Sequence, residues 1–355
     1  MNFKSYQNSI LSPIIKTSVL LLMVLTSTNI YAQNNERART NVGLVYPLSS
    51  NWTNAPRDTN SFSLNLIAGV SAAERGVSIA GFSNIVHHDA SGFQIAGFSN
   101  HIGKNASGTM VAGFMNTYSG GKAVAVAGFT NISSNASGAQ VAGFLNKGGD
   151  ISSLQLAGFL NIARDLKGTQ IAGFMNKAKK VKGSQIGFIN IADSAGTQIG
   201  IINIAKNGEK GISATIDENQ TTILAFRSGG KTIYGIIGLG YNFNNKREKY
   251  AYEAGIGAHV LKIQSFRLNA ELVGGGLESL KGEGNYSKSS FRLIPAFRIT
   301  PSIEIFGGPS FNYINTDTED GRNMTTKYIN SWTRNDGRNL YGFYVGYTAG
   351  VQVLF

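Results

Sequence analysis

Two patterns of apolar and polar residues divide the chain. From residue 76 to 205 an apolar phrase such as "QIAGFMN" returns nine times, and six or seven polar or small residues separate one phrase from the next. From about residue 211 to the end, apolar residues alternate with small or polar ones at a period of two. Stacked repeat units show the first pattern, and strands with one apolar face show the second. The sequence therefore predicts an all-β chain with a repeat block and a second, stranded region.

The repeat block predicts a short-period β-solenoid over residues 76–210. The glycine of the phrase recurs from Gly81 to Gly200 at spacings of 13 to 16 residues, and an asparagine stands three residues after each one. A unit this short cannot bury its own apolar side chains, so it has to stack on its neighbours at roughly 4.8 Å per unit. The phenylalanines after the glycines are expected to form the core, and the asparagines a hydrogen-bonded ladder at a corner. The central ladder members are Phe98, Phe114, Phe129, Phe144, Phe159 and Phe174, with Asn100, Asn116, Asn131, Asn146, Asn161 and Asn176.

The alternating region predicts a small antiparallel β-barrel of the outer-membrane type, with about eight strands. The expected strands lie near 41–48, 212–227, 231–243, 250–263, 266–277, 289–299, 302–314 and 341–355. One face of these strands is apolar with aromatic residues near the strand ends, as a lipid-facing wall requires, and the last residue is Phe355. The other face places charges of both signs in a lumen that eight strands leave just wide enough for side chains. This predicted lumen network consists of Glu253, Arg267, Glu271, Arg292, Arg298 and Glu304.

The lengths of the connections predict an orientation, because outer-membrane barrels use short periplasmic turns and longer outer loops. Short connections such as "QS" and "TP" alternate with longer ones, and the repeats occupy a long slot between the first two expected strands. On this division residues 33–75 hold a barrel strand and a lead-in, 76–210 the inserted or attached solenoid, and 211–355 the other barrel strands. The repeats are then expected outside the cell. The alternative is a secreted or periplasmic protein in which a soluble β-sandwich replaces the barrel.

The N-terminus and the absence of cysteine narrow the compartment. Residues 1–32 contain two lysines, the apolar run "SVLLLMVL" and a short polar stretch ending at Ala32, which is the layout of a secretory signal peptide. With no cysteine, neither a disulfide nor a thiolate metal site is expected. No later run approaches the roughly 18 apolar residues of a helical span, so a membrane protein of this sequence has to be a β-barrel.

Candidate chemistry is scarce along the chain. The acids of the repeats stand alone in their loops, so no paired acid and base is expected to act on a glycosidic bond. The "HHD" at residues 87–89 is interpreted as a solvated loop, since no other unit repeats it. No enzymatic activity and no cofactor are expected, and nucleic acid is a poor partner for an exported barrel. One basic cluster is interpreted either as a solvated corner or as a contact with anionic lipopolysaccharide: Lys177, Lys179, Lys180 and Lys182.

The "GxQIAGFxN" units, followed by "GIINIAKNG" and "AFRSGGKTIYGIIGLGYNF" and by a closing aromatic strand, resemble an uncharacterised family of bacterial surface-repeat proteins. The resemblance covers most of the chain after residue 32; it implies exposure at the outer membrane and supplies no catalytic residues. The leading hypothesis is a non-enzymatic outer-membrane surface protein whose lipid-embedded barrel displays the solenoid for binding or adhesion to a glycan or protein. The alternatives are a transport or channel component with the solenoid as a lid, and a purely structural envelope protein.

Overall fold

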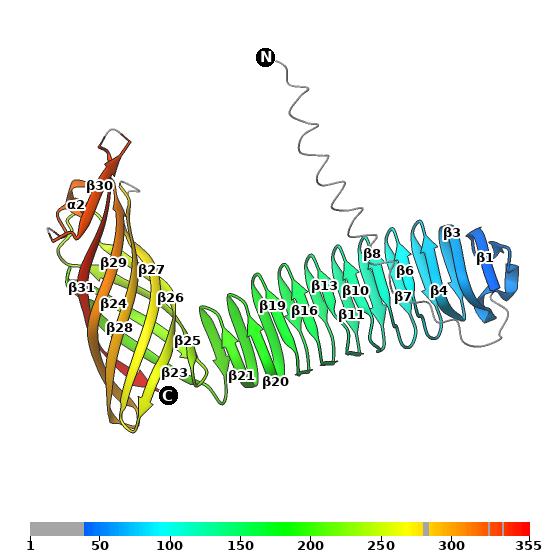
Figure 1. Cartoon of the computed structure of the whole chain (residues 1–355), viewed down its shortest axis with the longest axis horizontal. Coiled ribbons are helices and arrows are strands. Elements are labelled where there is room, and N and C mark those ends of the chain that lie inside the picture. Colours follow the sequence, from blue (N-terminus) through cyan, green and yellow to red (C-terminus); the bar gives the residue numbers. More distant parts are fainter. Residues whose placement is uncertain (1–38, 280–283, 326, 336) are drawn as a thin grey trace, which may run out of the picture. The chain divides into compact units, whose positions relative to one another are not determined.

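The computed structural model describes residues 39–279, 284–325, 327–335 and 337–355. The predicted signal peptide at 1–32 lies outside the described residues. Within them the chain forms a parallel β-solenoid followed by a closed antiparallel β-barrel (Figure 1). Among the described residues, no helix is long and apolar enough to span a membrane.

The solenoid contains 22 strands and one short 3-10 helix. These elements are β1 (Arg39–Val45), β2 (Leu48–Ser49), η1 (Trp52–Arg57), β3 (Thr59–Ser71), β4 (Ala73–Ala80), β5 (Ser83–Val86), β6 (Phe93–Ala96), β7 (Ser99–Ile102), β8 (Thr109–Ala112), β9 (Met115–Tyr118), β10 (Val124–Ala127), β11 (Thr130–Ser133), β12 (Asn135–Ala136), β13 (Gln140–Ala142), β14 (Leu145–Lys147), β15 (Asp150–Ile151), β16 (Leu154–Ala157), β17 (Leu160–Ile162), β18 (Asp165–Leu166), β19 (Thr169–Ala172), β20 (Met175–Ile186), β21 (Ile189–Ile199) and β22 (Ile202–Ala205).

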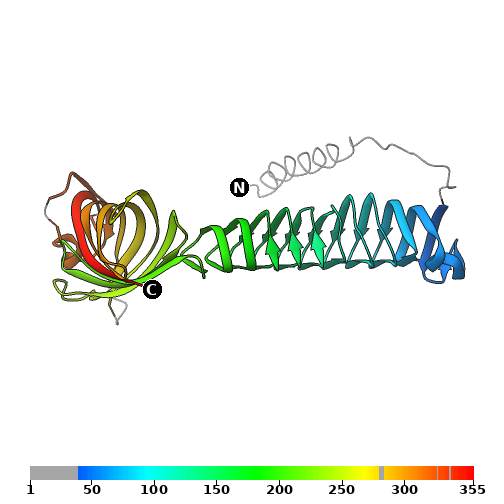
Figure 2. The ribbon, with the colours of Figure 1, turned by 90° about the horizontal axis from the view of Figure 1, so that it is seen from below.

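Each central turn of the coil has three faces, formed by parallel strands that pair with the equivalent strands of the turns above and below. The first face holds β10, β13, β16 and β19, the second β11, β14 and β17, and the third the two-residue strands β12, β15 and β18. Pairing in register places identical phrase positions on top of one another, as Asn146 on Asn161. Figure 2 shows these turns following one another along a single axis.

The phenylalanine ladder lies on the surface of the solenoid, so the prediction that it forms the core is wrong. Its rings, from Phe82 to Phe188, keep 37–53% of their surface exposed. The strand before each corner points Gln and Ala inward, as at Gln170 and Ala172, and the strand after it points Asn176 inward. The glycine and phenylalanine between them turn the corner and face out. Because three short faces enclose a narrow interior, amides, alanines and a few larger side chains such as Met110, Ile151 and Leu166 fill it, and the column of phenylalanine rings lies outside.

The asparagine ladder is inside the solenoid, on the second face and not at a corner. From Asn84 to Asn203 each side-chain amide nitrogen donates to the side-chain oxygen of the next asparagine at 2.8–3.0 Å. A parallel ladder of glutamines, not singled out from the sequence, runs inside the first face with amide distances of 2.7–2.9 Å; its members are Gln140, Gln155, Gln170, Gln185 and Gln198. The recurring "Q" of the phrase was the available signal. Buried amides are costly unless paired, and stacking supplies each partner from the neighbouring unit.

The solenoid begins before residue 76. Strand β1 pairs in parallel with β3, which in turn pairs in parallel with β4 and β5. The predicted barrel strand at 41–48, and with it the assignment of 33–75 to the barrel, is therefore wrong. Alternation alone does not separate the two cases, because a solenoid strand also has one buried and one exposed face. Strand β2 pairs antiparallel with β1, so the otherwise parallel stack begins with one antiparallel pair.

The barrel lies entirely after the solenoid. Its elements are β23 (Glu209–Asp217), β24 (Thr221–Gly229), β25 (Ile233–Asn242), β26 (Tyr250–Ile263), β27 (Phe266–Glu278), β28 (Tyr286–Thr300), β29 (Ile303–Thr316), the short helix α2 (Glu319–Arg322), β30 (Asn330–Arg334) and β31 (Asn339–Leu354). Eight antiparallel strands close the sheet through pairing of β23 with β31, and β30 pairs with the first residues of β31.

The predicted single strand at 212–227 is two strands, β23 and β24, joined by a tight turn. The Asp217 carboxylate accepts hydrogen bonds from the backbone N–H groups of Asn219 and Thr221 at 3.0 and 2.9 Å. Gln220 adopts a left-handed backbone with φ of 60°. Asp and Asn favour turns because their side chains form hydrogen bonds with the backbone a few residues on. The "DENQ" stretch at residues 217–220 is therefore the sequence signal for this turn. The extra strand keeps the count at eight after the loss of 41–48.

Candidate functional site

The barrel lumen is filled by a network of paired charges. Arg227 pairs with Glu271, which is completely buried and also accepts a hydrogen bond from the Tyr234 hydroxyl at 2.7 Å. Arg292 donates to the Glu253 carboxylate at 2.8 Å, and its other nitrogen lies 3.9 Å from Glu271. Burying charges is costly unless each meets an opposite charge, and here each cation meets at least one carboxylate.

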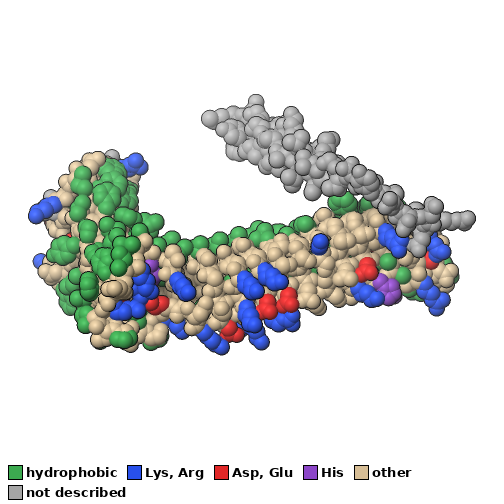
Figure 3. Space-filling view, turned by 60° about the horizontal axis from the view of Figure 1, so that its bottom comes forward, with side chains coloured by type: hydrophobic (Ala, Val, Ile, Leu, Met, Phe, Trp, Pro, Cys, Tyr) green, Lys and Arg blue, Asp and Glu red, His purple; other side chains and the backbone are tan. Residues whose placement is uncertain are grey.

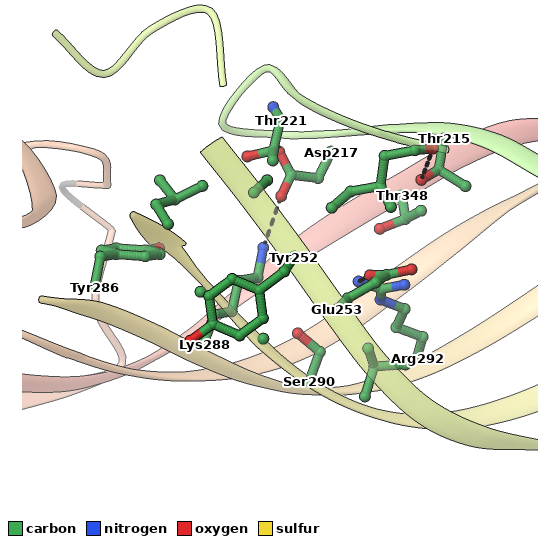
Figure 4. A pocket seen from close by; sticks show the side chains of 16 residues that line it. Thr215, Asp217, Thr221, Tyr252, Glu253, Tyr286, Lys288, Ser290, Arg292 and Thr348 are labelled. Atoms are coloured by element: carbon green, nitrogen blue, oxygen red, sulfur yellow. Dashed lines mark hydrogen bonds and ion pairs between the residues drawn. The ribbon is translucent and has the colours of Figure 1, made fainter. Parts of the chain in front are cut away.

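A second group of charges lies in the lumen towards the long connections. The Lys288 ammonium lies 3.0 Å from the Asp217 carboxylate and 2.9 Å from that of Glu218. The Tyr344 hydroxyl donates to Glu218 at 2.8 Å. Figure 4 shows Lys288 and the Glu253–Arg292 pair around a cavity of about 40 Å³. A cavity of that size has room for a few water molecules and not for a solute stream.

The six residues expected in the lumen network all point inward. Arg267 and Arg298 come together with Glu304 and with Glu209, whose carboxylate accepts from Arg267 at 2.7 Å and from Arg298 at 3.1 Å. Sequence reasoning missed Glu209, Arg227, Asp217, Glu218 and Lys288. The first four lie on or beside β23 and β24, which the sequence pattern joins into one strand at 212–227, and the predicted strand at 289–299 begins one residue after Lys288. A turn at "DENQ" would have restored their register.

The outer wall of the barrel is apolar, with aromatic residues near both ends. Leu224, Leu239 and Val345 each expose 60–72% of their surface along the wall. Phe266 and Phe297 lie edge to face beside the short turns, while Tyr241, Phe243 and Tyr250 form a similar group near the longer connections. Membrane barrels show this arrangement of an apolar band between two aromatic girdles.

The connections at the two ends of the barrel differ in length. At the end where β23 begins and β31 finishes, the turns are residues 230–232, 264–265 and 301–302. At the other end the connections are 218–220, 243–249, 279–285 and 317–338. The solenoid therefore joins the barrel at the end with the short turns. The repeats do not fill a long slot between barrel strands, which removes the basis for expecting them outside the cell.

The solenoid has one apolar edge, which we call the apolar ridge. It consists of the phenylalanines of the corner, Phe82, Phe98, Phe114, Phe129, Phe144, Phe159, Phe174 and Phe188, and the exposed aliphatic residues beside them on the first face, Ile95, Val111, Val126, Leu156 and Ile186. The first seven rings stack in parallel with centroids 4.7–4.9 Å apart. Figure 3 shows hydrophobic side chains along one edge of the solenoid and charged side chains along the opposite edge.

The predicted basic cluster is divided between faces of one coil. Lys177 lies on the second face, in one column with Lys147 and Ile162. Lys180 lies on the third face, stacked on Asp165. All four lysines are exposed. This part of the solenoid also carries an ion pair between Arg164 and Asp150 at 2.7 Å. Residues 87–89 of the "HHD" are exposed, and among the described residues no group of three His, Asp or Glu side chains is placed to hold a metal ion.

Two titratable groups are buried inside the solenoid. Burial raises the pKa of Glu74, while hydrogen bonds from Ser63 at 2.8 Å and Asn60 at 3.2 Å oppose the shift. Burial likewise raises the pKa of Tyr118 to about 12, and its hydroxyl accepts from Gln140 at 2.9 Å. Each group has hydrogen-bond partners within the coil and no counter-charge among these contacts, so each is a structural polar residue of the core.

Comparison with known proteins assigns no family to this chain. No protein-family model matches the sequence, and no curated protein matches it. Among solved structures the chain is similar to the crystal structure of Neisserial surface protein A (NspA), with 12% identity and a TM-score of 0.22. The match covers 42% of this chain and 94% of that one.

Proposed function

We propose that this protein is a non-enzymatic outer-membrane protein in which the barrel is the anchor and the solenoid is the displayed, binding part. The observation that carries the proposal is the closed eight-stranded barrel with an apolar outer wall and a lumen filled by ion pairs. An apolar outer wall is unfavourable in water and favourable in lipid. The interior of an eight-stranded barrel is only wide enough for side chains, and here ion pairs occupy it.

We further propose that the solenoid lies in the periplasm. Short turns mark the periplasmic end of outer-membrane barrels, and both termini of this barrel are at that end. The solenoid leads directly into β23 through residues 206–208. In this orientation Lys177 and its neighbours are on the side away from lipopolysaccharide, so surface adhesion is replaced by a binding role inside the envelope.

Single cysteines test the orientation cleanly, because the native chain has none. Ser152→Cys is in the solenoid and Ser331→Cys is in β30, within the connection of residues 317–338; both positions are exposed. Intact cells are treated with a maleimide attached to a polymer too large for porins. We expect Ser331→Cys to be modified on intact cells and Ser152→Cys to be modified only after the outer membrane is opened.

The controls separate the two parts of the proposal. Modification of Ser152→Cys on intact cells would place the repeats outside and overturn the periplasmic orientation. Loss of heat-modifiable gel mobility in the membrane fraction would overturn the barrel anchor itself, since folded barrels resist detergent until heated.

A further inference from the structure

We expect another molecule or a lipid phase to cover the apolar ridge, because a continuous apolar stripe along a whole solenoid is unusual on a surface that faces only water. The chemistry of the ridge restricts what that occupant is. Each inner phenylalanine has a neighbour against both ring faces, so the exposed part is the ring edge. Sugars and cations bind aromatic rings through the faces. A non-directional apolar medium therefore fits the ridge better than a glycan does.

The corner of the coil that follows the last ridge phenylalanine reaches the outer wall of the barrel. Its residues Gly200 and Ile201 lie against Gly235 of β25, where an added Cβ would come within 2.1 Å of the Ile201 carbonyl oxygen. The backbone N–H of Asn203 donates to the Ser228 hydroxyl at 3.0 Å, and Ser228 is the strand partner of Gly235. Gly235 shares its outward face with Ile237 and Leu239. The coil that follows the ridge thus contacts the wall that the proposed membrane covers.

Two lysines lie beside the apolar ridge, whereas most charged side chains of the solenoid lie along the opposite edge. Lys147 and Lys177 are exposed on the second face, each three residues after a ridge phenylalanine. Long lysine side chains next to an apolar edge can reach lipid phosphates while the edge enters the acyl region.

We propose that the apolar ridge rests on the periplasmic leaflet of the same membrane that holds the barrel, with its phenylalanine edges among the lipid acyl chains. This inference rests on the proposed function. A second copy of the chain is the less suitable occupant, because the ridge is a convex corner between two faces. Two convex edges meet along a line, whereas fluid lipid closes around a convex edge on both sides.

Quenching by brominated lipids tests the inference on the full chain. The two native tryptophans are replaced by Trp52→Phe and Trp332→Phe, and one tryptophan is then added at a time. Phe144→Trp reports on the ridge, with Phe114→Trp as a second ridge position, Ser152→Trp on the charged side and Leu239→Trp on the barrel wall. Each protein is reconstituted in phosphatidylethanolamine and phosphatidylglycerol vesicles with and without bromine on the acyl chains.

We expect bromine to remove most of the fluorescence of Phe144→Trp and Phe114→Trp, close to the loss seen for Leu239→Trp, and to leave Ser152→Trp unchanged. Quenching of Leu239→Trp without quenching of either ridge probe would overturn the inference while leaving the anchor intact. Unquenched ridge probes in a chain that crosslinks as a dimer would assign the ridge to a second copy. If Leu239→Trp itself is not quenched, the barrel is not in lipid and the proposed function fails first.

Discussion

In the middle of the solenoid, Asn146 is more deeply buried and makes more side-chain hydrogen bonds than Phe144, two residues before it. Asn146 donates to Asn161 at 2.9 Å and to the Leu156 carbonyl at 2.8 Å, and it accepts from Asn131 at 2.9 Å. Its side chain has no contact with water, whereas Phe144 keeps 39% of its surface exposed. The ladder therefore depends on each amide more than the ridge depends on each ring.

We expect Asn146→Ala to destabilise the coil more than Phe144→Ala. The first change removes the donor to the buried Asn161 side-chain oxygen, at about 1–3 kcal/mol for an unsatisfied group, whereas the Asn131 amide keeps the Val141 and Ala125 carbonyls as acceptors. The second should cost less than the roughly 3–5 kcal/mol of a fully buried phenylalanine. Amide hydrogen exchange in peptides over residues 130–162 measures both. A larger effect of Phe144→Ala would show that ring stacking dominates the coil.

Glu74 makes the first coils sensitive to pH. Its pKa is raised by burial in the folded chain, so between the unfolded value near 4.5 and the raised folded value the folded state holds the extra proton. Stability is then greatest below the unfolded pKa and falls as the pH rises through that window. Glu74→Gln should remove this fall. The measurement is the difference between the two proteins in exchange protection over residues 59–80 at acid and neutral pH; equal slopes would refute the assignment.

At the scale of one coil, the corner glycine sets how closely two units approach. At Gly158 an added Cβ would lie 2.2 Å from the carbonyl oxygen of Gly143, which is backbone and cannot move aside cheaply. Gly274, in barrel strand β27, has no atom within 4 Å of the same position. The glycine column is thus required by contact between backbones rather than by an unusual dihedral angle.

Gly158→Ala should therefore loosen the stacking of neighbouring coils, while Gly274→Ala should leave the protein unchanged. Limited proteolysis of the full chain reads this directly, because opened coils expose the loops of the third face. Faster cleavage in the solenoid is expected only for Gly158→Ala. Similar cleavage of both variants and the native protein would mean that the corners have slack.

Element types could be predicted from the sequence more reliably than the direction of each side chain. The alternation in 250–314 gave the barrel strands and the inward position of residues such as Glu271 and Arg292, because a period of two fixes a face. The corner breaks that period: two successive residues, glycine and phenylalanine, both face out, and no local pattern states which residues turn the corner. The two wrong strand predictions have other causes: β1 alternates as a barrel strand does, and the turn between β23 and β24 is marked only by Asp217 and its neighbours.

For the whole molecule, the filled lumen predicts a barrel that does not conduct. The pairs Arg227–Glu271 and Arg292–Glu253 cross the interior. Lys288 with Asp217 and Glu218 lies towards the end of the barrel with the longer connections. Planar-bilayer recordings of the purified protein should show no steady channels, with a porin in the same membrane as the positive control. Steady channels of porin-like size would favour the transport alternative, in which the solenoid acts on a solute path.

Because equivalent residues of neighbouring coils pair in register, the solenoid can be lengthened or shortened by whole coils. Asn146 stacks on Asn161, and Lys147 on Ile162. Removing residues 147–161 joins Asn146 to Ile162 and leaves every face matched, with the solenoid shorter by about 4.8 Å. We expect this deletion to keep heat-modifiable mobility and exchange protection in the remaining coils, and removal of residues 147–153 alone to abolish that protection. A chain built this way can set its reach within the envelope by duplicating or losing one unit, with both ends of the solenoid unaltered.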